Sequence, residues 1–480
     1  MKRAKVAIIA TPAIGNLVPA VEFATHLINH HHRCISVAIL VISMPQRPLI
    51  DDYVISRTST QHIRFIQIHT VDPPPPDQYH STIEFISLHI ENHKPNIKQT
   101  LKNLMDVDAV PDSVPVPLVG LFIDMFCTSM IDVANDLGIP SYLFFTSPAA
   151  YLGFVLHLTT FPATESISLA TELTVPSYAN PVPPNVLPSF CIKRKESGYS
   201  TFIHHALRYK ETKGIVVNTF QELEPYALDS LSSSKYFGLP PVYPVGPIID
   251  HFGPAKWHPN RSGQEKIIGW LDRQPSGSVV FLCLGSMGSL SRTQVREIAT
   301  GLERTGYRFL WTLREPAKAK LELPNDYKEF DENLFPDGFI DRTAETGLVC
   351  GWAPQVSVLA HEAIGGFVSH CGWNSILESL WYGVPIATWP LYAEQQLNAF
   401  EMVKEIGLSV ELRLDSRDKS SDLVLAEEVE RGVRELMDGR DGELRRKVKE
   451  MSEKSKNALM ENGSSFGSLG NLIDILFSNV

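Results

Sequence analysis

Residues 352–395 place hydrogen-bond donors, acceptors and aromatic rings around one predicted helix start. The central segment reads Ser369-His-Cys-Gly-Trp-Asn-Ser375, and the apolar residues before it predict a strand that turns into an amphipathic helix. Asn374 and Ser375 would lie in the first turn of that helix, where unpaired backbone N–H groups and the positive end of the helix dipole favour a phosphate. His370, just before the turn, could add a further donor.

Two other side chains extend this predicted site. Glu378 lies four residues after Asn374 and three after Ser375, so it shares their helix face. A carboxylate there suits the paired hydroxyl groups of a ribose. Trp352 follows the apolar run 348–350 and would emerge at the end of a strand, where its ring could stack on a base. Together these residues predict binding of a nucleotide diphosphate sugar.

The stretch resembles the signature box of plant secondary-product glycosyltransferases, which are family 1 UDP-sugar-dependent enzymes of GT-B fold. The match runs from Trp352 to Gln395 and includes His370, Gly372, Trp373, Asn374, Ser375, Glu378, Gly383, Pro385, Trp389, Pro390 and Glu394. A match of this length is far more specific than a lone glycine-rich loop. The resemblance extends along most of the chain, from the turn at residues 12–19 to the segment 461–465.

The resemblance implies a set of donor contacts. Trp352 would stack on uracil, Ser286 and its turn would contact a phosphate, and Thr146 would contact a sugar hydroxyl. Glu394 and Gln395 would bind further sugar hydroxyls. The full predicted UDP-sugar site is Thr146, Ser286, Trp352, Ala353, Gln355, His370, Gly372, Trp373, Asn374, Ser375, Glu378, Tyr392, Glu394 and Gln395.

The residues that close the box also predict the identity of the sugar. Gln395 at its last position, with Trp373 inside it, resembles the members that use UDP-glucose. The box contains no arginine that could pair with a glucuronate carboxylate. We therefore expect UDP-glucose to be preferred over UDP-galactose and UDP-glucuronate. The resemblance also implies a small acceptor such as a phenol or a terpenoid.

The expected catalytic base is where the chain departs from the family. In the family, a Pro-x-x-Gly-His element supplies a histidine that removes the acceptor's proton, and a downstream aspartate orients it. This chain reads Pro12-Ala-Ile-Gly15-Asn16, with Asp124 where the aspartate belongs. The Asn16 amide can hold a hydroxyl group but cannot take its proton at neutral pH. Either the enzyme is adapted to acidic acceptors, or a histidine has been replaced to trap a complex.

Predicted strands and helices alternate in two similar halves. Strands are expected near residues 6–10, 35–42, 118–123 and 141–145, and again at 279–285, 307–313 and within the box. Such alternation predicts an α/β class with parallel sheets, here two Rossmann-like domains whose sheets face a cleft. The predicted boundaries are 1–245 for the acceptor domain, 246–262 for a proline-rich linker that begins at about Pro240, and 263–458 for the UDP-sugar domain. By analogy with the family, residues 459–480 would form a helix that returns to the first domain.

Composition sets the wider limits. The 480 residues suggest two domains. A net charge of −11 argues against nucleic acid or an anionic membrane as the main partner. The six cysteines lack paired spacing, which favours free thiols in the cytoplasm. No run reaches the length of a membrane span. Histidines 26, 30, 31 and 32 end a helix and lack a Cys or carboxylate partner at ligand spacing, so no metal or other cofactor is expected. We expect a monomer.

Three functions fit these features to different degrees. An inverting UDP-glucosyltransferase accounts for the whole box. A catalytically impaired protein that binds a sugar nucleotide or an aglycone would account for Asn16. A nicotinamide-dependent oxidoreductase would have similar sheets, but the turn Thr11-Pro-Ala-Ile-Gly15 has one glycine where the dinucleotide fingerprint needs three. Formation of a glucoside from UDP-glucose separates the first two.

Overall fold

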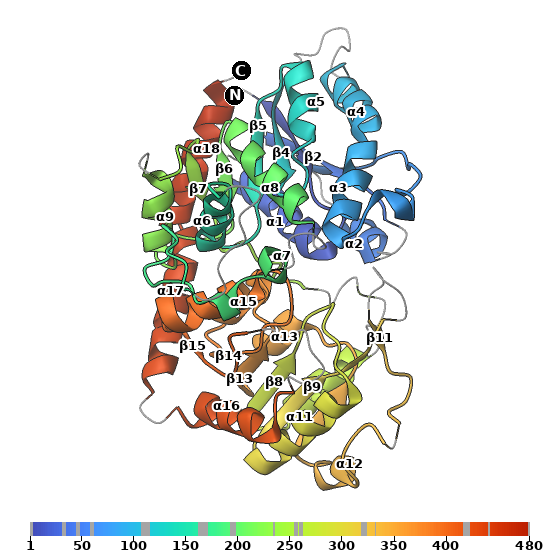
Figure 1. Cartoon of the computed structure of the whole chain (residues 1–480), viewed down its shortest axis with the longest axis vertical. Coiled ribbons are helices and arrows are strands. Elements are labelled where there is room, and N and C mark those ends of the chain that lie inside the picture. The colour runs from blue at the N-terminus through green and yellow to red at the C-terminus, as the bar shows by residue number, and fades with distance from the viewer. Residues whose placement is uncertain are drawn as a thin grey trace.

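The computed structural model describes most of the chain as two α/β domains, one above the other in Figure 1. The described residues are 3–30, 35–44, 49–57, 62–106, 116–161, 171–192, 198–233, 236–253, 258, 263–317, 324–331, 333–415, 423–439 and 442–478. Each domain is built on one parallel sheet. The apolar runs in the sequence form these strands because a parallel sheet covered on both faces buries every side chain.

The N-terminal domain contains a seven-stranded sheet in the order β3-β2-β1-β4-β5-β6-β7. Its strands are β1 (Ala4–Ile9), β2 (Ile35–Val41), β3 (Ile63–Gln67), β4 (Leu118–Asp124), β5 (Ser141–Phe145), β6 (Ile215–Val217) and β7 (Val242–Pro244). Its helices are α1 (Ile14–His30), α2 (Leu49–Arg57), α3 (Thr82–Asn92), α4 (Lys94–Asp106), α5 (Met130–Leu137), α6 (Ala149–Leu158), α7 (Ser189–Ile192), α8 (Tyr199–Arg208) and α9 (Pro225–Ser232). The predicted apolar face of α1 is buried against the sheet.

The C-terminal domain contains a six-stranded sheet in the order β12-β9-β8-β13-β14-β15. Its strands are β8 (Val279–Cys283), β9 (Arg308–Thr312), β12 (Gly347–Cys350), β13 (Ile364–Ser369), β14 (Ile386–Thr388) and β15 (Ser409–Val410), and β10 (Arg314–Glu315) pairs separately with β11 (Asn325–Asp326). Its helices are α10 (Gln264–Leu271), α11 (Arg292–Thr305), α12 (Phe339–Arg342), α13 (Gln355–Leu359), α14 (Trp373–Trp381), α15 (Gln395–Phe400), α16 (Ala426–Asp438) and α17 (Glu443–Leu459).

The last helix, α18 (Ser464–Ser478), packs on the N-terminal domain beside β7 and α1. Its apolar residues Leu472, Ile473 and Leu476 belong to the same core as Val6 and Phe122. Among the described residues no helix is long and apolar enough to cross a membrane, and no group of three or more His, Cys, Asp or Glu side chains could hold a metal ion.

Three segments rich in proline or charge contain regular structure or buried side chains. The proline-rich stretch that begins at Pro240 includes the edge strand β7 (Val242–Pro244), where proline is tolerated. In the segment 176–188, Tyr178, Val182 and Val186 are buried. The charged segment 438–456 belongs mostly to α17, which buries Val448 and other residues.

Thiol placement is also visible in the described part of the chain. Cys127, Cys283 and Cys371 are free and buried, Cys350 is free and half-buried, and Cys191 is buried. Cys34, His31 and His32 lie outside the described residues. His30 contacts the carbonyl of Phe466 at 3.0 Å and so joins α1 to α18, and burial lowers the pKa of His26 to about 4.

Candidate active site

The predicted site residues gather where the carboxyl ends of the two sheets meet. Thr11, Asp124 and Thr146 follow or end the neighbouring strands β1, β4 and β5. On the other domain, Ser286, Trp352, His370 and Glu394 follow β8, β12, β13 and β14. Parallel strands present their carboxyl ends at one sheet edge, which is the usual ligand position in such folds.

On the N-terminal side, Asp124 is bound by two side chains. Asn16, in the first turn of α1, donates from Nδ2 to Oδ2 of Asp124 at 3.0 Å, and the Thr11 hydroxyl donates to Oδ1. Asp124 is 1% exposed, and burial raises its pKa although both hydrogen bonds oppose the shift. The Asn16 amide thus donates to Asp124, as the ring N–H of the expected histidine would, but it has no basic nitrogen. Sequence reasoning missed Thr11, whose only signal is its place directly before the Pro12 turn.

Thr146 and Ser147 connect this pair to the C-terminal domain. Asn16 Nδ2 also lies 3.4 Å from the hydroxyl oxygen of Thr146. The next hydroxyl, on Ser147, donates across the junction to Oε1 of Glu394 at 3.4 Å. Burial raises the pKa of Glu394. Asn16, at the position of the expected base, and Glu394, predicted to bind the sugar, are therefore joined by two adjacent hydroxyl groups, of which Ser147 was not predicted.

A second contact between the domains comes from the start of α14. Cys371 has a φ of 63°, a left-handed conformation that turns the chain sharply from β13 into the helix. Asn374, in the first helical turn, donates from Nδ2 to the backbone carbonyl of Gly15 at 2.9 Å. Its Oδ1 is buried and has no partner in the structure. The predicted phosphate-binding turn therefore contacts Gly15, the residue before Asn16.

Gln355 joins two residues of the predicted ribose and phosphate site. Its Nε2 donates to the hydroxyl of Ser375 at 2.8 Å and to Oε2 of Glu378 at 2.7 Å. Burial raises the pKa of Glu378 to about 7, although the hydrogen bond from Gln355 opposes the shift. The spacing that predicted Ser375 and Glu378 on one helix face is correct, and α13 supplies the amide that holds them together.

His370 is enclosed by two glycines. A Cβ on Gly285 would lie 2.6 Å from His370 Nε2, and one on Gly372 would lie 2.5 Å from the same atom. Larger residues at either position would collide with the ring, so both glycines serve its placement. His370 Nδ1 is buried without a partner, and burial lowers the pKa of the ring to about 4. A neutral imidazole still has one N–H to donate to a phosphate.

Trp352 stands at the end of β12, as predicted, but its ring has a neighbour. The imidazole of His258 stacks on it with ring centroids 4.2 Å apart and planes inclined by 5°. Burial, with Arg314 nearby, lowers the pKa of His258 to about 4, so the stacked ring is neutral. Ser286 is exposed, and Arg314 donates to its backbone carbonyl at 2.8 Å. The exposed ring of Tyr392 lies 6.5 Å from that of His370.

Three predicted residues have side chains committed elsewhere. Trp373 is 3% exposed, and its indole N–H donates to the carbonyl of Asn218 in the N-terminal domain at 2.7 Å. Gln395 Oε1 accepts from the backbone N–H groups of Leu391 at 3.0 Å and of Tyr392 at 3.1 Å, which leaves its NH₂ group for a sugar. Ala353 is buried in the core of its domain, so only its backbone could reach a ligand.

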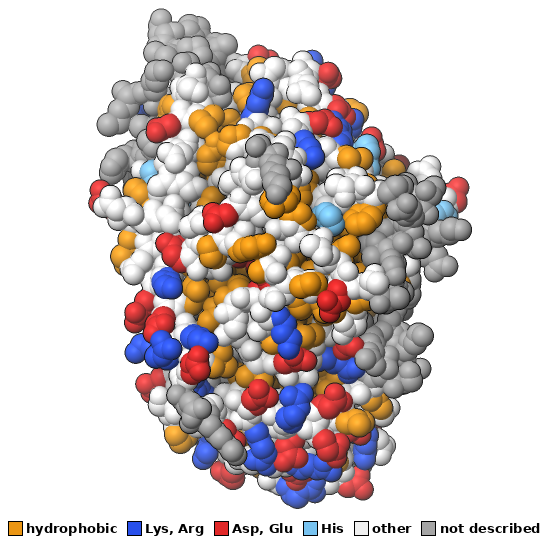
Figure 2. Space-filling model, turned by 60° about the vertical axis from the view of Figure 1, so that its left-hand side comes forward, with side chains coloured by type: hydrophobic (Ala, Val, Ile, Leu, Met, Phe, Trp, Pro, Cys, Tyr) orange, Lys and Arg blue, Asp and Glu red, His pale blue; other side chains and the backbone are white. Residues whose placement is uncertain are grey.

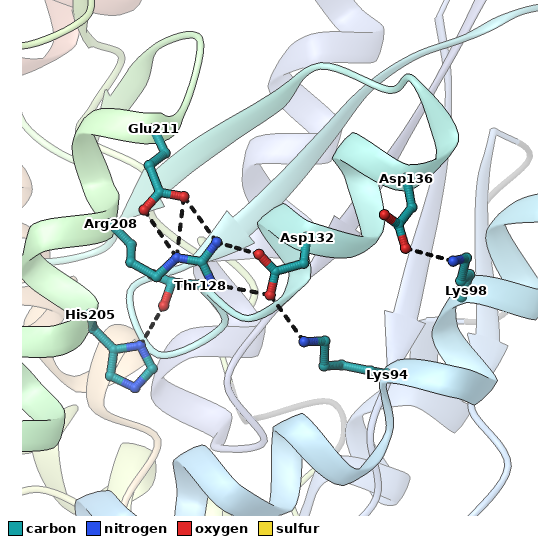
Figure 3. A network of polar contacts seen from close by, with 8 residues as sticks. All are labelled: Lys94, Lys98, Thr128, Asp132, Asp136, His205, Arg208 and Glu211. Atoms are coloured by element: carbon teal, nitrogen blue, oxygen red, sulfur yellow. Dashed lines mark hydrogen bonds and ion pairs between the residues drawn. The ribbon is translucent and has the colours of Figure 1, made fainter.

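A network of polar contacts holds the helices next to the end of β4, beyond Asp124 (Figure 3). His205 on α8 lies between the hydroxyls of Thr128 at 2.7 Å and Ser87 at 2.8 Å, and burial lowers its pKa to about 3. Arg208, one turn later, binds Asp132 of α5 at 2.5 Å. These contacts hold α3, α5 and α8 around the end of β4, where the Phe126 ring packs edge-on against His205 at 5.7 Å.

The outer surface gives no sign of a polyanion site on the face that Figure 2 shows. Basic and acidic side chains are interspersed over the lower part of this face, and hydrophobic side chains gather higher up. Basic and acidic side chains also alternate on α16 and α17, where they form ion pairs, for example Arg434 with Glu430 at 2.9 Å and Arg446 with Glu450 at 2.5 Å. Mixed charge of this kind does not concentrate a positive field.

Comparison with known proteins identifies the family. Residues 235–435 match the family model described as UDP-glucoronosyl and UDP-glucosyl transferase. The chain is 55% identical to UDP-glycosyltransferase 43 of Pueraria montana var. lobata, over all of both chains. It is 45% identical to UDP-glucose flavonoid 3-O-glucosyltransferase 6 of Fragaria ananassa, over 98% of each.

The fold has the same relatives among solved structures. Medicago truncatula UGT71G1 complexed with UDP-glucose superposes with a TM-score of 0.88 at 43% identity, and the match covers 99% of this chain and 98% of that one. The two parallel-sheet domains thus form the GT-B fold that the signature box predicted, and the chain transfers a sugar from a UDP-sugar to a small molecule. It belongs to the plant family 1 UDP-glycosyltransferases.

Proposed function

We propose that this enzyme is an inverting UDP-glucose-dependent glucosyltransferase that favours acceptors which ionise readily. The observation that carries the proposal is the bond from Asn16 Nδ2 to Asp124, 3.0 Å long. It reproduces the geometry of a base–orienter pair with a side chain that cannot accept a proton. The Fragaria ananassa relative, a UDP-glucose flavonoid 3-O-glucosyltransferase by name, supports UDP-glucose as donor and a flavonoid-like acceptor.

In the proposed reaction the acceptor oxygen bonds to the anomeric carbon from the side opposite UDP. The bond between that carbon and the diphosphate oxygen breaks, and its electron pair leaves with UDP. The first turn of α14 and the neutral His370 would stabilise the charge that develops on the diphosphate. Holding both reactants together lowers the barrier even without a base.

The acceptor's proton is the step that this chain does not assist. The Asn16 amide oxygen can accept a hydrogen bond from the acceptor hydroxyl and orient it. Asp124 is 1% exposed and already bound by Thr11 and Asn16, so it is poorly placed to replace a base. An acceptor that is already ionised, such as a carboxylate or an acidic phenol, needs no proton removed.

The test is Asn16→His, assayed with UDP-glucose against acceptors of graded pKa. A positioned general base contributes about 10²–10⁴ in rate, so turnover should rise by that order on weakly acidic hydroxyls and change little on ionised acceptors. Asn16→Ala is the control, because it removes the amide and adds no base. An equal gain on all acceptors, or none on weakly acidic ones, would contradict the proposal.

We also infer that the enzyme acts as a monomer in the cytoplasm and needs no metal ion. Donor-side and acceptor-side residues meet within one chain, through Asn374 with Gly15 and Glu394 with Ser147. The described thiols suit a reducing compartment. Backbone and side-chain donors at α14 can serve the diphosphate without a cation. Light scattering should give the mass of one chain, and a tagged chain should be found in the cytoplasm. A chelator should leave turnover unchanged.

A further inference from the structure

Helix α15 belongs to the C-terminal domain and packs against the N-terminal domain. Leu397 and Phe400 belong to the buried cluster that contains Leu152 and Leu228. Figure 1 shows α15 at the junction of the two domains. The helix starts with Glu394 and Gln395, the proposed sugar-binding pair, and continues into a π-helical turn, Glu401–Glu405. Turns of this type often occur at functional sites.

Two carboxyl groups face each other across this junction. Glu401, the first residue of the π-helical turn, and Glu224, directly before α9, are each 3% exposed. Their side chains lie close enough to interact directly. Two adjacent carboxylates cannot both be ionised in a buried place without a large cost, so one of them must hold a proton.

The local contacts decide which carboxyl group holds that proton. Glu224 accepts backbone N–H groups on both oxygens, from Ala150 at 2.7 Å and from Ala149 at 3.0 Å. These residues form the N-terminus of α6, whose dipole favours an anion. Oε2 of Glu401 is buried without a partner. Glu224 is therefore the carboxylate, and Glu401 is the carboxylic acid that donates to it.

The surrounding titratable groups reinforce the arrangement. Among the described residues, the charge of Glu405 also acts on Glu401, and the charges of Glu401, Glu224, Glu405 and Glu394 all act on Tyr178. All of these groups are acidic. Glu405 is engaged separately, because it accepts the N–H groups of Ala179 at 2.7 Å and of Asn180 at 2.9 Å. The burial of Glu401, followed by the charge of Glu224, raises its pKa well above the ordinary value.

We propose that Glu401 and Glu224 share one proton across the domain junction, and that Glu401 is thereby a positioning residue for the sugar-binding start of α15. Glu401 would not touch the substrate. It acts through the helix, whose first residues lie about two turns away. The effect on the donor rests on the proposed role of Glu394 and Gln395, whereas the shared proton does not.

The sign of the pH dependence follows from the raised pKa of Glu401. The folded protein keeps a proton that an unfolded glutamate releases near its ordinary pKa. The stability that the pair contributes is complete below the ordinary pKa and is lost as the pH rises through the raised value. Alkaline pH should therefore loosen α15 and weaken the binding of the sugar more than that of UDP.

The decisive variant is Glu401→Gln, whose amide can still donate to Glu224 and has no proton to lose. Without ligand, the temperature of thermal unfolding should fall towards alkaline pH in the parent and much less in Glu401→Gln. The infrared difference between the two should contain a protonated carboxyl band at neutral pH. Glu453→Gln removes an exposed carboxylate on α17 and is the control for net charge, and it should behave like the parent.

A second measurement tests the positioning role. The ratio of UDP-glucose to UDP affinity should fall several-fold in the parent between neutral and alkaline pH, and stay constant in Glu401→Gln. If both proteins lose stability alike and the infrared band is absent, the shared proton is refuted. If the band is present but the affinity ratio follows the same course in both, the positioning role is refuted. Failure of glucose transfer itself would refute the proposed function and leave the infrared result standing.

Discussion

The side-chain amide of Asn374 donates to the backbone carbonyl of Gly15, 2.9 Å away, and so joins the predicted diphosphate turn of one domain to the residue before Asn16 in the other. The two residues are 359 positions apart in sequence. Because Gly15 directly precedes Asn16, this hydrogen bond connects the phosphate helix to the backbone that carries the Asn16 amide.

Asn374→Ala should therefore lower kcat as well as weaken the donor. A hydrogen bond of this kind contributes about 0.5–1.5 kcal/mol, which corresponds to a loss of roughly 2- to 10-fold from the Gly15 contact alone. Steady-state kinetics and calorimetry with UDP would separate the two effects. A variant that binds UDP more weakly but keeps the parental kcat at saturation would show that the contact does not position residue 16.

Thr11→Val should destabilise the protein, because it leaves one oxygen of the buried Asp124 without its donor. The expected cost is about 1–3 kcal/mol in the free energy of unfolding, measured in urea. Thr11→Ser keeps the hydroxyl group and is the matched control. Equal stability of the valine and serine variants would mean that the hydroxyl does not hold Asp124.

Trp352→Ala should weaken UDP binding by about 1–3 kcal/mol, the range measured for stacking of nucleic-acid bases on aromatic side chains. The stack with His258, at 4.2 Å, shows that the indole already accepts a flat ring on one face. Calorimetry of UDP is the measurement, and Trp352→Phe should retain part of the affinity. Parental binding by a folded alanine variant would place the base elsewhere.

Glu378 predicts how UDP binding depends on pH. Its pKa is raised to about 7 by burial, so a large fraction is protonated at neutral pH without ligand. A carboxylate accepts both ribose hydroxyls, and we therefore expect UDP affinity to increase as the pH rises through 7. The stability that Glu378 contributes to the ligand-free fold depends on pH in the opposite direction, because this contribution is lost as the pH rises through about 7.

Glu378→Gln should abolish that increase in UDP affinity, and Glu378→Ala should weaken UDP more than a 2′-deoxy nucleotide. Calorimetry at several pH values with both nucleotides is the measurement. A parental pH profile in the glutamine variant would remove Glu378 from the ribose site.

UDP-glucose should bind more tightly than UDP-galactose or UDP-glucuronate. The carbonyl of Gln395 is held by the N–H groups of Leu391 and Tyr392, which orients its NH₂ group as a donor to a sugar hydroxyl. The box has no arginine for a glucuronate carboxylate. Competition of the three donors in one transfer assay provides the test, and comparable affinities would refute the preference.

The sequence alone determined the two parallel-sheet domains, because strands buried on both faces form apolar runs such as Val279–Cys283 that are legible without a structure. It also placed Ser375 and Glu378 on one helix face, since helical spacing is local. Helices α2, α3 and α4 were not predicted, although Ser81 and Glu84 form a capping box at the start of α3.

Only the tertiary structure decided the contacts that cross from one domain to the other. Trp373 binds Asn218, Asn374 binds Gly15, and Glu401 lies beside Glu224. Each pair joins residues that are far apart in the chain, and no local period or spacing relates them. Such contacts depend on how the two folded domains pack against each other. The sequence could therefore indicate which groups do the chemistry, while the docking decided which of them face a ligand and which hold the domains together.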